Sequence, residues 1–315
     1  MNKRAFLIGA AMVLLVNFVA VSLRAYAEAE FLQQFDKGQL PWLFVANAAG
    51  FAVATLGYDL VTRKAHTKSV DLVLLLALIG TTGATPALLD AGASPVLVVV
   101  AITAVSQLVG LALWNRVAEA VAGRDARRNL PRAGAAVTAG GMIAGLGAGL
   151  LGIKGDVLPY LGAGVSAIVL VLSFAQARAL ALGGAPGAML PPGTSDVLGP
   201  LQHRLLRALI AVAILEGVIA TVVDFQFLAE LKTEYPTNTA TALLLFYGGT
   251  NAVLLLLQAT AVPRLLVTRS LPTTGGIHPT LVVLWYIGFA FAPGLIAIAG
   301  TRTTDQVLRL ATSRT

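Results

Sequence analysis

The stretch RLLRALIAVAILEGVIATVVDFQFLAEL, residues Arg204–Leu231, decides what kind of protein this chain is. It opens with arginine, continues through an apolar run of span length and leaves that run at Asp224. A helix of about 20 apolar residues crosses the roughly 30 Å hydrocarbon core of a bilayer. Glu216 lies near the middle of the run, where an ionised carboxylate is unfavourable by roughly 2.5–3.5 kcal/mol on insertion scales. Glu216 is therefore the first candidate site residue.

The composition of the whole chain agrees with a membrane protein. Of its 315 residues 57% are hydrophobic and 12% are charged, and the mean hydropathy is +0.82. Soluble domains carry about 25% charged residues. The net charge of +7 resides in short loops between apolar runs, a pattern that indicates orientation and no nucleic-acid partner. With no cysteine, and with all three histidines in loops, the sequence predicts neither a metal site nor a cofactor.

Apolar runs of span length recur along the chain. They predict an all-α, polytopic transmembrane helical bundle of about nine spans in contact with membrane lipid, because an open sheet cannot satisfy its backbone there. The predicted spans are Phe6–Leu23, Leu40–Val61, Val70–Leu89, Pro95–Trp114, Ala133–Ile153, Val157–Gln176, Leu205–Val223, Ala240–Val262 and Thr280–Gly300.

The first run has two interpretations. Basic residues, an apolar stretch and Ala25-Tyr26-Ala27 resemble a signal peptide with its cleavage site. The run is also long enough to be a retained first span, and Arg24 lies within the cleavage region of the alternative. Most Lys and Arg fall on the side of the bundle that holds the N-terminus, which predicts a multi-pass protein of the cell inner (plasma) membrane with a cytoplasmic N-terminus.

A Gly- and Pro-rich stretch divides the chain. It predicts a six-span N-terminal bundle over residues 1–176, a cytoplasmic linker over 177–203 and a three-span, incomplete second bundle over 204–315. The tail Thr301–Thr315 is spaced like the first turns of another helix. One interpretation is a solvated C-terminus. The other is a truncated chain, with further spans or a soluble domain beyond Thr315.

Amide side chains inside the predicted spans form a second group of candidates. Asn17, Gln107, Asn251 and Gln258 lie in spans on both sides of the linker and could line a path for a solute together with Glu216. The alternative is that each amide makes a hydrogen bond across a helix interface, worth roughly 0.6 kcal/mol.

Three glycines in the fifth span form a packing motif. Gly141, Gly145 and Gly149 are four residues apart and so lie on one face of a helix. Such a face allows another helix to approach closely, either as static packing or as a surface for rocking.

The loop after the second span resembles a known loop of the major facilitator superfamily. Gly57, Asp59, Arg63 and Lys64 are similar in type to the G-x-x-x-D-R-x-G-R-K loop, which implies that Asp59, Arg63 and Lys64 latch two bundles in one state. A basic inner loop with no such function is the alternative.

Further residues resemble the bacterial ATP/ADP-translocase-like (nucleotide transporter-like) branch of that superfamily. They are Arg24 with Glu30-Phe31-Leu32, Gly123–Arg128, Asp224-Phe225-Gln226-Phe227, and Phe246-Tyr247 with Asn251 and Gln258. The resemblance implies two six-helix bundles around a central cavity that move solutes by alternating access. The chain differs from the known nucleotide exchangers, which place cations within spans, because no predicted span here has a central cation.

The sequence therefore predicts a secondary transporter-like protein that moves a small solute, such as an organic anion or a nucleotide, by alternating access. The alternative is a non-transporting membrane scaffold or sensor with a soluble partner domain. An enzyme is not predicted, because no loop carries a P-loop, a G-x-S-x-G motif or paired carboxylates.

Overall fold

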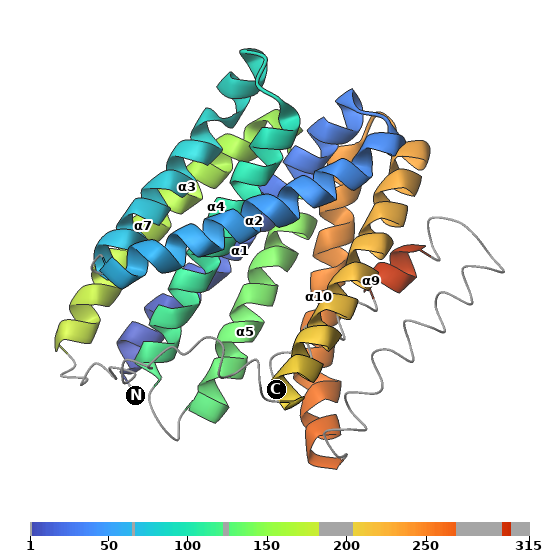
Figure 1. Cartoon of the computed structure of the whole chain (residues 1–315). Helices are drawn as coiled ribbons and strands as arrows, with labels where there is room; N and C mark the ends of the chain where they lie inside the picture. The colour runs from blue at the N-terminus through green and yellow to red at the C-terminus, as the bar shows by residue number, and fades with distance from the viewer. Residues whose placement is uncertain (1, 65–66, 122–125, 183–203, 269–297, 304–315) are drawn as a thin grey trace.

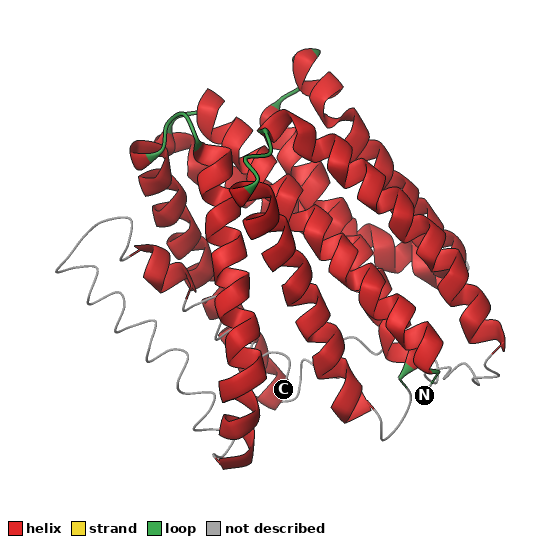
Figure 2. Cartoon of the chain, turned by 180° about the vertical axis from the view of Figure 1, so that it is seen from behind, coloured by secondary structure: helices red, strands yellow, loops and turns green. Residues whose placement is uncertain are grey.

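A computed structural model of the chain describes residues 2–64, 67–121, 126–182, 204–268 and 298–303. Every regular element within these ranges is helical (Figures 1 and 2). The elements are α1 (Lys3–Gln34), η1 (Lys37–Gln39), α2 (Leu40–Lys64), α3 (Thr67–Asp90), α4 (Pro95–Ala120), α5 (Ala126–Met142), η3 (Ile143–Gly147), α6 (Ala148–Leu150), η4 (Gly155–Val157), α7 (Leu158–Leu182), α9 (Arg204–Glu234) and α10 (Thr239–Thr268). Residues 298–303 form a further helical segment.

Seven of the described helices are long and apolar enough to cross a membrane. They match the first six predicted spans and the eighth. The predicted seventh span lies in α9, where side chains are described only from Gly217 onward, and the predicted ninth lies almost entirely outside the described residues. The chain is thus an all-α, multi-pass membrane bundle.

Helix α1 lies at the centre of the bundle. It packs against α4, α5, α7 and α10, and its buried residues include Met12, Leu23 and Phe31. A helix that is apolar on all sides is stable only when it is surrounded by others. Helix α2, which crosses obliquely in front of the bundle in Figure 1, instead exposes Trp42, Val53 and Leu56, as a helix facing lipid does.

The chain runs up and down the bundle, with one end holding the start of α1. The opposite end, here called the distal end, is where α1 and α9 finish and where α10 begins (Figure 1). We call α1–α7 the N-terminal set, and α9, α10 and residues 298–303 the C-terminal set. Helix α10 joins the two sets by packing against α1, α5 and η3.

Several helices continue beyond the predicted apolar runs, and two of these extensions matter for the site and the linker. Helix α1 does not end near Leu23 but continues to Gln34, because buried residues such as Tyr26 and Phe31 extend its packing surface by three turns. Helix α7 continues to Leu182, so the first residues assigned to the linker 177–203 are helical. Residues 183–203 lie outside the described part of the chain.

Candidate functional site

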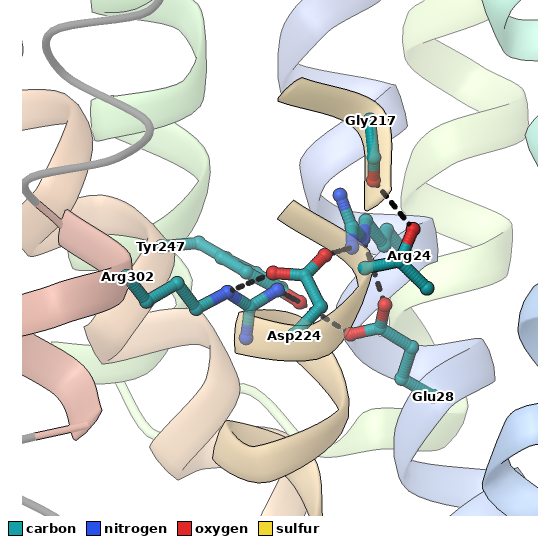
Figure 3. Close-up of polar contacts among 7 residues, drawn as sticks. Arg24, Glu28, Gly217, Asp224, Tyr247 and Arg302 are labelled. Carbon is teal, nitrogen blue, oxygen red and sulfur yellow. Dashed lines mark hydrogen bonds and ion pairs between the residues drawn. The ribbon is translucent and has the colours of Figure 1, made fainter. Parts of the chain in front are cut away.

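The extension of α1 brings two charged residues into the bundle. Arg24 follows the apolar run directly, and Glu28 lies one turn later on the same face. The Arg24 Nε donates to Glu28 Oε1 at 2.7 Å. Had α1 ended at Leu23, both side chains would lie in a loop in water. The longer helix instead directs them toward α9 and α10 (Figure 3).

Two charges from the C-terminal set meet this pair. Asp224 follows the apolar run of α9, and its Oδ2 accepts from Arg24 Nη2 at 3.0 Å. Arg302, from the segment 298–303, lies on the other side of Asp224, with its Nε 2.7 Å from Oδ1. That contact is an ion pair by distance, although its angle is not that of a hydrogen bond. One carboxylate thus lies between two guanidinium groups.

Tyr247 of α10 completes the arrangement. Its hydroxyl donates to Glu28 Oε2 and accepts from Arg302 Nη2 at 3.0 Å. The Arg302 guanidinium also lies over the rings of Phe227, Phe246 and Tyr247, at 4.3, 5.3 and 5.0 Å from their centroids. Aromatic faces attract cations most strongly where water is excluded. We call Arg24, Glu28, Asp224, Tyr247 and Arg302 the charge cluster (Figure 3).

The charge cluster is buried to different degrees. The side chain of Arg302 is fully buried, those of Glu28 and Asp224 are 7% and 18% exposed, and that of Arg24 is 40% exposed. Two cations and two anions leave no net charge. Buried charges are tolerated only when they are paired, so this balance explains how the cluster can exist inside the bundle.

Further contacts join the two sets at the distal end, beyond the charge cluster. The Lys37 Nζ donates to Thr233 Oγ1, and the Lys232 Nζ donates to the backbone oxygen of Phe35. A polar cavity of about 370 Å³ lies at the same end. Its walls come from both sets and include Glu30, Gln33, Lys154, Asp156, Asn238 and Thr241.

Three of the predicted path residues lie around α5. Asn17 of α1 donates to the backbone oxygen of Val137 at 2.7 Å, and Thr138 donates to Gln258 of α10 at 3.3 Å. Asn251 donates to the backbone oxygen of Tyr247 at 2.8 Å and lies against Gly141. These amides form a polar seam that continues from the charge cluster toward the opposite end. Gln107 lies apart from it, on the exposed face of α4.

Glu216 is helical in α9, but its side chain lies outside the described residues. It precedes Asp224 by eight residues, which places its backbone about 12 Å deeper along the helix axis. Of the predicted latch, Asp59 is exposed at the end of α2, and the side chains of Arg63 and Lys64 lie outside the described residues. Where the described side chains join the two sets by ion pairs, they do so at the distal end.

The glycine face packs against α10. A methyl group added at Gly145 would lie 2.2 Å from the backbone nitrogen of Gly248 and 2.3 Å from the oxygen of Leu244. Added methyl groups at Gly141 and Gly149 would meet Asn251 and Leu245 at 2.8 and 2.7 Å. The helix widens into a π turn, η3, at the same place. The backbones of α10 and η3 therefore touch, which only glycine permits.

Sequence reasoning missed the charge cluster. It placed Arg24 and Asp224 at span ends and Arg302 in the tail, and it found no central cation. A signal was nevertheless present, since Arg24, Asp224 and Arg302 each lie at or within two residues of the end of an apolar run, and Arg24 and Glu28 have helical spacing. Arg302 lies two residues beyond the predicted ninth span, and the structure shows that a cation at such a span end can be fully buried.

No protein-family model and no curated protein matches this chain. A crystal structure of the nucleoside transporter NupG, in a mutant form, aligns with 98% of this chain and 82% of its own at a TM-score of 0.61 and 17% identity. The fold is facilitator-like. At that identity the likeness defines the fold alone, and it gives no support to the ATP/ADP-translocase-like branch.

Proposed function

We propose that the chain is a secondary transporter that moves a small polar solute across the membrane by alternating access. The observation that carries this proposal is the charge cluster, a buried polar contact between two sets of helices in a facilitator-like fold. In alternating access two bodies rock around a fixed site, and contacts between them are made at one end while they are broken at the other. The solute leaves chemically unchanged.

The polar seam supports a path between the two sets. Asn17 and Asn251 lie about one to two turns below the charge cluster, and Glu216 lies at a similar depth on α9. We place solute contact or coupling at Glu216 and the amides, with Gln107 the weakest member because it lies apart. The glycine contact between η3 and α10 supplies a smooth surface on which one body can rock against the other.

Charge balance favours an uncharged solute. Arg302 is a buried cation and Arg24 a partly exposed one, but Glu28 and Asp224 already neutralise them, so the cluster offers no net positive charge to a phosphate. Nucleosides are the first class to test, because NupG is a nucleoside transporter by name. Nucleotides and organic anions are the comparison classes. We further propose insertion in the cell inner (plasma) membrane with a cytoplasmic N-terminus, from the distribution of Lys and Arg.

Uptake into proteoliposomes tests the proposal. Purified protein should give saturable uptake of at least one labelled nucleoside, and excess unlabelled nucleoside should compete. Glu216→Gln should abolish the pH dependence of uptake, whereas Glu234→Gln, an exposed acid on the same helix, should leave uptake unchanged. If folded protein gives no saturable uptake of nucleosides, nucleotides or organic anions, the chain is not a transporter for these classes and the membrane scaffold becomes the better interpretation.

A further inference from the structure

The four charges of the cluster can be paired in two ways. Within the sets, Arg24 pairs with Glu28 on α1, and Arg302 pairs with Asp224 in the C-terminal set, each at 2.7 Å. Between the sets, Arg24 pairs with Asp224 at 3.0 Å, and Tyr247 links Glu28 to Arg302. Arg24, Glu28 and Asp224 therefore each have one contact in their own set and one in the other, whereas Arg302 reaches the N-terminal set only through Tyr247.

We propose that the charge cluster is the gate of the distal end, and that it opens by dividing into two neutral ion pairs. This inference deepens the proposed transport function. When the sets separate, Arg24 keeps Glu28, and Arg302 keeps Asp224. Neither body then carries an uncompensated buried charge, which would otherwise be strongly unfavourable. The contacts between the sets hold the gate closed, and the contacts within the sets make the open state accessible.

The rest of the distal end agrees with a closed gate. The two lysine contacts, from Lys37 to Thr233 and from Lys232 to Phe35, are hydrogen bonds between the sets at exposed or half-buried positions. Such contacts contribute little individually, so they can break without a large barrier. The 370 Å³ cavity has walls from both sets and must change shape when they separate.

The natural absence of cysteine allows a direct test. The double substitution Lys37→Cys and Thr233→Cys places one thiol on each set at the closed contact, where a bismaleimide can join them. A second pair, Gln33→Cys and Lys154→Cys, places both thiols on the N-terminal set, around the same cavity. The second pair reports on folding, because gate opening does not separate its members. Both pairs are measured without solute, so their result does not depend on whether the right solute has been found.

Two matched variants separate the pairings. Both variants remove the two ion pairs of Arg24. Arg24→Gln with Glu28→Gln keeps the Asp224–Arg302 pair within the C-terminal set, whereas Arg24→Gln with Asp224→Asn keeps the link from Glu28 through Tyr247 to Arg302. Each variant removes one cation and one anion. In the first variant only the neutral Asp224–Arg302 pair remains. Opening then leaves no buried charge without a partner, and the attraction between the sets is weaker. In the second variant Glu28 and Arg302 remain on opposite sides of Tyr247. Opening would leave each of these charges without a partner of opposite charge.

The two variants should therefore behave oppositely. The first should lower the rate of crosslinking between Lys37→Cys and Thr233→Cys about tenfold, because it removes both contacts between the sets, the Arg24–Asp224 charge pair and the hydrogen bond from Tyr247 to Glu28. The second should crosslink at least as fast as the parent. Equal rates in the two variants overturn the proposal, as does a variant that slows the Gln33→Cys and Lys154→Cys pair by the same factor. The expected pattern in a protein without uptake would contradict transport but retain the gate.

Discussion

Two buried ionic groups lie among the described residues of the bundle, and they differ in construction. At the start of α3, Asp71 accepts from Arg116 Nε of α4 at 2.6 Å, with side chains 4% and 13% exposed. Both residues belong to the N-terminal set, and α3 packs directly against α4. The second Asp71 oxygen is buried and has no hydrogen-bond partner among the described residues. In the charge cluster, by contrast, each charge has two connections and the residues come from both sets.

The Asp71–Arg116 pair is a brace, an ion pair that holds two helices of one set together, whereas the charge cluster is a contact between the sets that can be broken. Among the described residues, neither member of the Asp71–Arg116 ion pair has a second charged partner, so separation of α3 from α4 would leave two unpaired buried charges. The charge cluster can lose both of its contacts between the sets and keep every charge paired. A buried ion pair within one body therefore restricts motion, whereas a branched network between two bodies permits it.

The largest effect is expected at the brace. Asp71→Asn leaves the Arg116 guanidinium buried without its counter-charge and should lower the free energy of unfolding by roughly 3–5 kcal/mol. The midpoint of thermal unfolding in detergent measures this loss. Replacing both partners by apolar residues, as in Asp71→Leu with Arg116→Met, should recover most of it. A single variant as stable as the parent would remove the distinction between the two groups.

A smaller effect is expected at the centre of the charge cluster. Tyr247→Phe removes the hydroxyl that joins Glu28 to Arg302 and leaves both partners short of a hydrogen bond in the closed state. The closed state should lose roughly 1–3 kcal/mol, the usual effect of a buried polar group left without its partner. Slower crosslinking between Lys37→Cys and Thr233→Cys, with the Gln33→Cys and Lys154→Cys pair unchanged, would measure it. Unchanged crosslinking in both pairs would exclude Tyr247 from closure.

The smallest effect is expected at the exposed contact beyond the cluster. Lys37→Met removes the hydrogen bond to Thr233 but keeps the apolar part of the side chain. Exposed polar contacts are weakened by water and salt, so neither the unfolding midpoint nor the rate of solute uptake should change measurably. A loss as large as that of Tyr247→Phe would show that closure depends on the surface contacts and not on the buried network.

The positions of the site residues show how far the sequence could lead. The glycine spacing in the fifth span pointed to a close helix contact, and the structure places Gly145 against the backbone of α10. The amides were recognisable because polar groups are rare in apolar runs, and three of the four lie along one seam. Glu216 was predicted as a site residue for the same reason. Asp224 and Arg302 were not predicted as site residues, because a charge at the end of an apolar run is the ordinary arrangement in a membrane helix.

The sequence by itself determined that the chain is a helical membrane bundle, because the length of each apolar run and the need for internal backbone hydrogen bonds leave no other fold in lipid. It also determined most helix positions, since those depend on residues that are neighbours in the chain. Only the tertiary structure decided which charges are buried and with which partners. Arg24, Asp224 and Arg302 are far apart in the sequence, and their pairing depends on how α1, α9 and the segment 298–303 pack around α10.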